Sequence, residues 1–297
     1  MATTIITDLK EKFRRGSLCL QLVYINAALF VAVSLVQIAL LLFNCSSTGL
    51  LEWVELPASF TRFAMQPWSL FTYMFMHAGL LHVLFNMLWL YWFGQLFLNS
   101  FSAKHLRGLY VLGGICGGLL YMLSYNIFPY FRPMLEGSYL LGASASVLAV
   151  VAAVAYREPD YPVRFLLLGT VRMKYLALIV IGLDLLFVKS ANAGGHIAHL
   201  GGALAGLWFA ASLNKGHDTT AWINRLIDIL SSLFSPKTRR PKMTVHPGGG
   251  RRQEYDYNAR KKAQNDEIDR ILDKLKQSGY DSLTTDEKRS LFDASKR

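Results

Sequence analysis

The sequence has few charged residues for its length. Only 17% of the 297 residues are Asp, Glu, Lys or Arg, whereas 53% are hydrophobic. Soluble domains carry roughly 25% charged residues, so this composition favours a polytopic membrane protein. The net charge of +11 does not call for nucleic acid, because the basic residues gather at the chain ends and between apolar runs. We therefore expect no nucleic-acid partner.

Cysteine and metal-binding patterns are also scarce. The three cysteines, Cys19, Cys45 and Cys116, show no spacing typical of a metal site and no obvious pairing. The His-Glu-x-x-His pattern of zinc proteases is absent. His77 and His82 are five residues apart and lie on different faces of a helix, which makes them a poor metal pair. The sequence predicts neither a metal nor another cofactor.

Apolar runs long enough to cross a membrane recur along the chain. A span needs about 20 apolar residues for a hydrocarbon core of ~30 Å. The first run is too long for the core of a signal peptide and lacks a clear cleavage site, so we count it as a span. We expect an all-α bundle of six transmembrane helices at about 18–43, 78–98, 108–127, 139–156, 175–188 and 193–213.

The basic residues predict the orientation of these spans. The connections after the first, third and fifth spans each hold one basic residue, whereas the opposite side holds many more. Because basic residues favour the cytoplasmic side, both termini are expected to be cytoplasmic. The short N-terminus and the missing transit peptide then favour a bacterial plasma membrane.

The character of the chain changes after the last span. Apolar residues at helical spacing predict an amphipathic helix on the membrane surface, and a stretch with prolines, glycines and nine Lys/Arg predicts a disordered linker. A capping box, Thr284-x-x-Glu287, marks the second helix of a small hairpin. The expected regions are a cytoplasmic N-terminus (1–17), the six-span domain (18–213), the amphipathic helix (214–234), the basic linker (235–262) and the helical hairpin (263–297).

Several polar side chains lie inside the predicted spans, where they are costly and usually functional. Ser144 and His199 form a candidate nucleophile and base. His82 and Asn86 share one helical face and are candidate oxyanion donors, and Gly142 lets a backbone approach closely. In the predicted topology, the serine and both histidines lie a few residues from the outer ends of their spans. We expect a shared cavity that opens outward and holds water.

The glycines of the sixth span fix the register of its histidine. Gly202 and Gly206 are four residues apart, a spacing that lets two membrane helices pack closely. His199 lies on the same face, so close packing against the fourth span would bring it beside Ser144. Asp184 is an intramembrane acid without an evident partner, and we therefore expect a Ser-His dyad.

The polar residues of the spans belong to three motifs, which are His77-x4-His82-x3-Asn86, Gly142-Ala143-Ser144-Ala145 and Ala198-His199-x-Gly201-Gly202-x3-Gly206. Together these motifs resemble the rhomboid family of intramembrane serine proteases, and the resemblance covers about residues 18–213. Three features differ from the family pattern. Ala145 replaces a usual glycine, Leu148 replaces a tyrosine that some members pack on the histidine, and Trp68-Ser69 stands where many members have Trp-Arg.

The resemblance implies a six-span fold and a set of roles. Ser144 would be the nucleophile and His199 the general base, while His82 and Asn86 would complete the oxyanion hole. His77 is expected to anchor a loop by hydrogen bonding. The substrates would be transmembrane segments of other proteins, cut near the outer face of the bilayer.

A non-catalytic function is the alternative. A rhomboid-like protein without activity could bind and hold client transmembrane helices. The presence of both Ser144 and His199 favours the protease.

Overall fold

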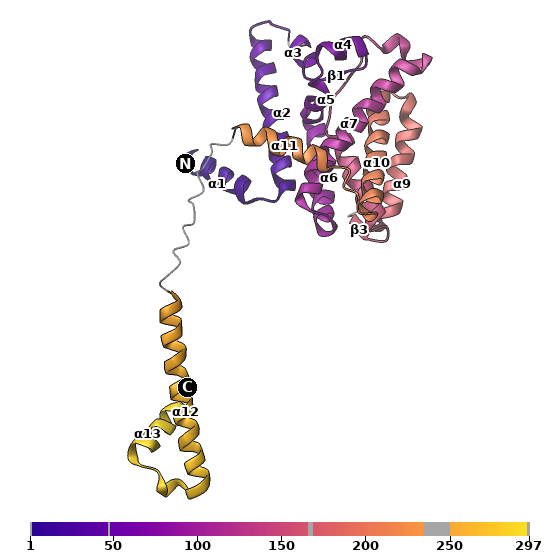
Figure 1. Cartoon of the computed structure of the whole chain (residues 1–297). Helices are drawn as coiled ribbons and strands as arrows, with labels where there is room; N and C mark the ends of the chain where they lie inside the picture. Colours follow the sequence, from indigo (N-terminus) through magenta and orange to yellow (C-terminus); the bar gives the residue numbers. More distant parts are fainter. Residues whose placement is uncertain (1, 47, 166–168, 235–249, 296–297) are drawn as a thin grey trace. The chain divides into compact units, whose positions relative to one another are not determined.

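The structure, a computed structural model, is mainly helical (Figure 1). The chain divides into two compact units, Met1–Ser235 and Pro236–Arg297, which are described separately. The residues that the structure describes are 2–46, 48–165, 169–234 and 250–295.

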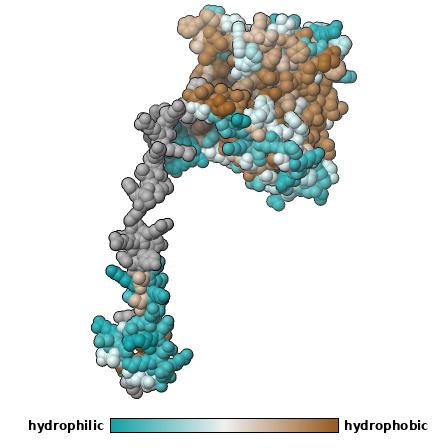
Figure 2. All heavy atoms as spheres, in the orientation of Figure 1, coloured by the Kyte–Doolittle hydropathy of each residue, from teal (hydrophilic) through white to brown (hydrophobic). Residues whose placement is uncertain are grey.

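Four helices of the first unit are long and apolar enough to cross a membrane, among the residues described. They leave many large apolar side chains exposed, including Leu35, Phe85 and Trp208. Figure 2 shows hydrophobic residues over much of the visible face of this unit. Such a surface suits lipid and not water, so the protein is an integral membrane protein. The four helices are α2 (Leu18–Leu42), α6 (Leu80–Ser100), α7 (Ala103–Ile127) and α10 (Ala193–Asn214).

The two other predicted spans are shorter helices. α8 (Ser144–Arg157) and α9 (Met173–Leu186) have 14 residues each, or about 21 Å at ~1.5 Å per residue. The prediction that the fourth span begins at 139 was wrong, because strand β2 (Tyr139–Leu140) and Gly142, at a φ of 129°, keep the chain non-helical up to Ser144. Ser144 is thus the first residue of its helix and does not lie a few residues inside it.

Small residues hold α8 between α7 and α10. A Cβ atom placed at Gly202 would lie 2.1 Å from the carbonyl oxygen of Ala145, and one at Gly206 would lie 2.1 Å from that of Ala149. On the other side, a Cβ at Gly117 would lie 2.6 Å from Cβ of Ala145. The close packing predicted from the glycine spacing is confirmed. The extra methyl group of Ala145 fits because residue 117 is a glycine.

The connection between α2 and α6, residues 44–76, is folded against the segment that precedes Ser144. The rings of Trp53 and Trp68 stack with centroids 5.5 Å apart. Strand β1 pairs antiparallel with β2, with Leu56 opposite Leu140. The loop therefore supports the entry to α8. Its elements are α3 (Thr48–Glu52), β1 (Leu56–Pro57), α4 (Phe60–Met65), α5 (Ser69–Thr72) and the short 3-10 helix η1 (Tyr73–Phe75).

A two-stranded antiparallel hairpin, β3–β4, precedes α9. The side-chain carboxylate of Asp160 forms ion pairs with Arg172 and Lys174 beside this hairpin. The remaining elements of the first unit are α1 (Ala2–Arg15), η2 (Pro129–Met134), β3 (Pro162–Phe165), β4 (Gly169–Arg172), η3 (Phe187–Lys189) and α11 (Ala221–Phe234).

Helix α11 has one buried and one exposed apolar face. Ile223 is buried, whereas Trp222 and Leu230 are exposed. Arg107 of α7 donates to Asn224 at 2.8 Å and pairs with Asp228 at 2.7 Å. The helix that the sequence predicts after the last span is present, and these contacts attach it to the bundle.

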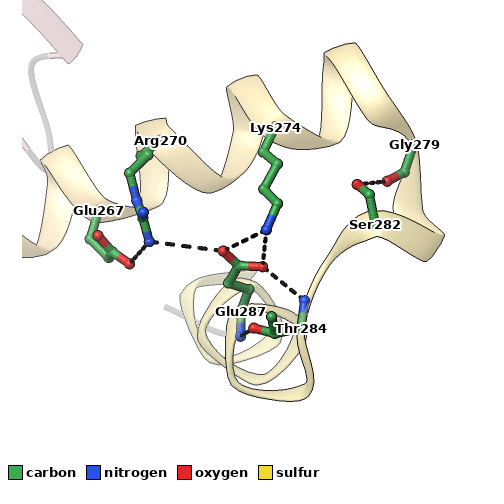
Figure 3. A network of polar contacts seen from close by, with 7 residues as sticks. All are labelled: Glu267, Arg270, Lys274, Gly279, Ser282, Thr284 and Glu287. Atoms are coloured by element: carbon green, nitrogen blue, oxygen red, sulfur yellow. Dashed lines mark hydrogen bonds and ion pairs between the residues drawn. The ribbon is translucent and has the colours of Figure 1, made fainter.

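The second unit is a helical hairpin. α12 (Gly250–Ser278) starts inside the stretch 235–262 that was expected to be a linker, so that expectation was wrong for residues 250–262; residues 235–249 lie outside the described part of the chain. The capping box is confirmed, because Thr284 N donates to Glu287 at 2.8 Å and Glu287 N donates to Thr284 Oγ1 at 3.3 Å (Figure 3). The hairpin continues through η4 (Tyr280–Ser282) into α13 (Thr285–Ser295).

Candidate active site

Ser144 is presented by a sharp turn at the start of α8. Gly142 adopts a positive φ that side chains rarely accept, and its N–H donates to the carbonyl of Tyr73 at 2.9 Å. A Cβ at Gly142 would lie 3.0 Å from His82 Nε2 and 3.6 Å from Ser144 Oγ. The glycine is therefore needed where the serine hydroxyl and the histidine ring approach one backbone segment. The first turn of a helix also has N–H groups without an intrahelical acceptor.

The ring of His82 is oriented by a backbone hydrogen bond. The N–H of Ala78 donates to Nδ1 of His82 at 3.4 Å. A neutral imidazole that accepts at Nδ1 carries its hydrogen on Nε2, the atom that faces Gly142. Asn86 lies one turn further along α6, is buried, and donates to the carbonyl of His82 at 2.9 Å. His82 thus directs a donor toward the region of Ser144.

Asp184 contacts the histidine predicted to act as a base. Its Oδ1 atom lies 2.8 Å from Nδ1 of His199 and 2.8 Å from Nδ1 of His196. A carboxylate oxygen accepts, so both rings donate from Nδ1 and Nε2 is left as the acceptor nitrogen. His199 therefore has the tautomer that a general base requires.

One cavity joins the polar residues of the site. It has a volume of about 960 Å³. The segment around β2 and the start of α10 form part of its wall together with the other helices. The polar residues of interest that line it are His82, Asn86, Ser144, Asp184, His196 and His199.

The remaining predicted site residues lie outside this lining. Gly202 and Gly206 lie at the contact between α8 and α10. His77 packs edge-on against His82, with ring centroids 5.2 Å apart. The hydrogen-bonding role expected for His77 stays a prediction.

Asp184 is the residue whose contacts the sequence did not reveal. We expected a dyad because no acid stood at an obvious position, yet the structure brings Asp184 from α9 to the ring of His199. The one signal in the sequence was the cost of an acid inside an apolar helix, which requires a partner. The partners lie 12 and 15 residues away on the next helix and share no motif with it.

The fold and the cavity define a helical integral membrane protein with a serine, three histidines, an asparagine and an acid at one site. The Rhomboid domain family matches residues 64–215, about half of the chain. The chain belongs to the rhomboid family, whose members are usually intramembrane serine proteases. Residues 254–297 match a second family, DUF6576, described as a family of unknown function.

Individual relatives lead to the same family. The chain is 31% identical over 203 residues to Presenilin-associated rhomboid-like protein A, mitochondrial, of Danio rerio, covering 65% of this chain and 47% of the relative. It is 27% identical over 157 residues to RHOMBOID-like protein 12, mitochondrial, of Arabidopsis thaliana, covering 50% and 47%. It is 25% identical over 207 residues to Rhomboid protease GlpG of Pectobacterium atrosepticum, covering 69% and 65%.

The similarity covers only part of these proteins. The chain spans about half the length of the mitochondrial relatives that it matches. These relatives do not fit the bacterial plasma membrane that the sequence had suggested, whereas the Pectobacterium relative is bacterial.

Proposed function

We propose that the protein is an intramembrane serine endopeptidase that cleaves transmembrane segments of other membrane proteins. The observation that carries the proposal is the 2.8 Å contact between Asp184 and His199 in the cavity that Ser144 also lines. It is supported by membership of a family of which most members are proteases. Asp184 extends the dyad expected from the sequence to three groups.

In the proposed mechanism, Ser144 Oγ attacks the carbonyl carbon of the scissile peptide bond. Nε2 of His199 takes the hydroxyl proton and later gives it to the leaving amine. Asp184 keeps the hydrogen of His199 on Nδ1 and stabilises the imidazolium that forms. Water then attacks the acyl carbon on Ser144 while His199 takes a proton from the water. The bond from the acyl carbon to Ser144 Oγ breaks, and His199 returns the proton to Oγ.

Charge develops on the carbonyl oxygen during the attack. The donors available for it are Nε2–H of His82, the side-chain amide of Asn86 and the N–H of Ser144 at the start of α8. A neutral donor in a poorly hydrated cavity stabilises an oxyanion more than it would in water. The φ of Gly142 lets these donors converge without a side chain between them.

The proposed architecture has six spans, with both termini on the cytoplasmic side. In addition to the four long helices, the apolar surfaces of α8 and α9 support two further crossings. The short length of α8 is compatible with its place in the bundle interior, where protein and not lipid surrounds it. Helix α9 instead exposes apolar side chains such as Leu178 and Leu186, which suits contact with lipid. We therefore place the six-span bundle within the membrane and α11 at the membrane surface. Helices α12 and α13 form a separate tail module.

A reporter with a single transmembrane segment tests the proposal. Reporter cleavage during co-expression is expected for the unaltered chain and for Ser146→Ala, and its loss is expected for Ser144→Ala and His199→Ala. Ser146 is a matched control because it is a buried serine two residues further along α8. Reporter binding without cleavage in every variant would favour the non-catalytic alternative.

A further inference from the structure

Asp184 contacts one more histidine than the proposed proteolysis uses. Nδ1 of His196 and Nδ1 of His199 each lie 2.8 Å from its Oδ1. We infer that these three side chains form a binding site for a divalent transition-metal ion such as Zn²⁺, and that an ion bound there inhibits the enzyme. The inhibitory effect rests on the proposed function, whereas the binding site does not.

The donor set suits such an ion. One ligand atom from each of the three residues lies within 4.8 Å of the other two. Zinc takes imidazole nitrogen and carboxylate oxygen at about 2.0–2.2 Å, which places tetrahedral ligands roughly 3.3–3.6 Å apart. The two contacts of 2.8 Å would therefore open by roughly half an ångström. His196 and His199 are three residues apart on α10, so both rings reach one point.

A second observation concerns the other carboxylate oxygen. Oδ2 of Asp184 is buried and has no hydrogen-bond partner in the described part of the chain, and the side chain is only 7% exposed. Leaving a buried charged oxygen unpaired is costly. Among the described residues, the ion-pair contacts of this acid are to the two histidines and not to lysine or arginine. The site thus offers a negative charge that a metal cation would balance.

The three groups are also accessible. His196 and His199 have side chains 20% and 23% exposed, and all three residues line the cavity of about 960 Å³. A water molecule from the cavity could complete a four-ligand shell. An arrangement of three protein ligands and one water is the usual one for accessible zinc.

Metal binding changes the tautomer of the base. A neutral His199 that ligates through Nδ1 must carry its hydrogen on Nε2. It can then no longer accept the proton of Ser144, and the proton that was on Nδ1 has moved to Nε2 of the same ring. Occupancy therefore removes general-base catalysis while leaving the serine in place.

The first experiment measures binding without any need for activity. Full-length Ser144→Ala protein, purified in detergent and freed of metal with a chelator, is titrated with Zn²⁺ against a chromophoric competitor. We expect one Zn²⁺ site. Its affinity for Zn²⁺ should fall by roughly tenfold or more when Asp184→Asn or His196→Gln is added. The matched control is His217→Gln, which alters an exposed histidine outside the cavity. Equal affinity in all four proteins would overturn the inference.

The second experiment measures inhibition on the active enzyme. Cleavage with and without Zn²⁺ is expressed as a ratio for each protein, so that a change in basal rate cancels. Zn²⁺ is expected to inhibit cleavage by the unaltered chain, and EDTA is expected to restore that cleavage. In His196→Gln, the Zn²⁺ concentration needed for inhibition should rise by roughly tenfold or more. Inhibition equally strong in His196→Gln would overturn the inference. If no protein cleaves, the proposed function has failed, and the binding titration still decides the site.

Discussion

Oδ1 of Asp184 on α9 lies 2.8 Å from Nδ1 of His199 on α10. This contact fixes the orientation and tautomer of the histidine. It also explains why an acid lies in an apolar helix, since the carboxylate is buried and paired with imidazole rings.

Asp184→Asn should lower proteolysis strongly. An amide in place of the carboxylate can donate to Nδ1, which favours the wrong tautomer and does not stabilise the imidazolium. The expected loss is on the order of 10²- to 10⁴-fold in kcat, by analogy with soluble serine proteases, with KM little changed. Cleavage kinetics on a transmembrane peptide in detergent measure it. Asp160→Asn, an exposed acid in the β3–β4 hairpin, is the control; unaltered kcat in Asp184→Asn would contradict the assignment.

Gly206→Ala should weaken the packing of α10 on α8. The new Cβ would meet the carbonyl oxygen of Ala149 at 2.1 Å, a backbone atom that cannot move without its helix. The expected cost is about 1–3 kcal/mol in the free energy of unfolding, seen as a lower melting temperature in detergent. Gly182→Ala on α9 is the matched control, because nothing lies within 4 Å of its Cβ position. Equal melting temperatures for the two variants would count against the packing.

The proposed crossing by α8 predicts that its two flanking loops lie on opposite sides. In a Cys45→Ser background, cysteine at Arg132 should react with an impermeant maleimide from outside, and cysteine at Tyr161 only after the membrane is permeabilised. The two other native cysteines, Cys19 and Cys116, are buried or partly buried. If both engineered cysteines react from one side, α8 does not cross and the six-span topology is incorrect.

The tail hairpin should loosen in acid. The N–H of Thr284 and the ammonium of Lys274 lower the pKa of Glu287 from 4.5 to about 2. Because the folded pKa is the lower one, this carboxylate stabilises the hairpin above pH 4.5, and its contribution is lost as the pH falls toward 2. Hydrogen exchange of residues 264–295 in the full chain, corrected for intrinsic rates, should show this loss of protection.

Two variants separate Glu287 from general acid effects. Glu287→Gln should reduce protection at neutral pH and flatten its dependence on pH. Glu267→Gln, which removes an exposed partner of Arg270 on the same helix, should behave like the unaltered chain (Figure 3). An unchanged pH dependence in Glu287→Gln would contradict the assigned cause.

Sequence patterns predicted local features well. The apolar runs predicted the long helices, the glycine spacing predicted the contact between Gly202 and α8, and Thr284-x-x-Glu287 predicted the cap. These features depend on residues close together in the chain. The family could also be predicted from the sequence, because its motifs are short and occur in a fixed order.

Features that depend on tertiary contacts were not predictable. The start of α8 at Ser144 follows from the turn at Gly142 and the pairing of β2 with β1, which joins segments far apart in the chain. The partner of Asp184 depends on how α9 packs against α10. The start of α12 at Gly250 was not predictable either, because a composition rich in Lys, Arg and Gly is typical of a disordered linker.

Covalent labelling tests the central claim most directly. Purified protein is treated with a fluorescent fluorophosphonate, which reacts with a serine hydroxyl activated by a base. The account predicts labelling of the unaltered chain and of Ser146→Ala, and none of Ser144→Ala or His199→Ala. Labelling of Ser144→Ala equal to that of the unaltered chain would contradict the assignment of Ser144 as the nucleophile.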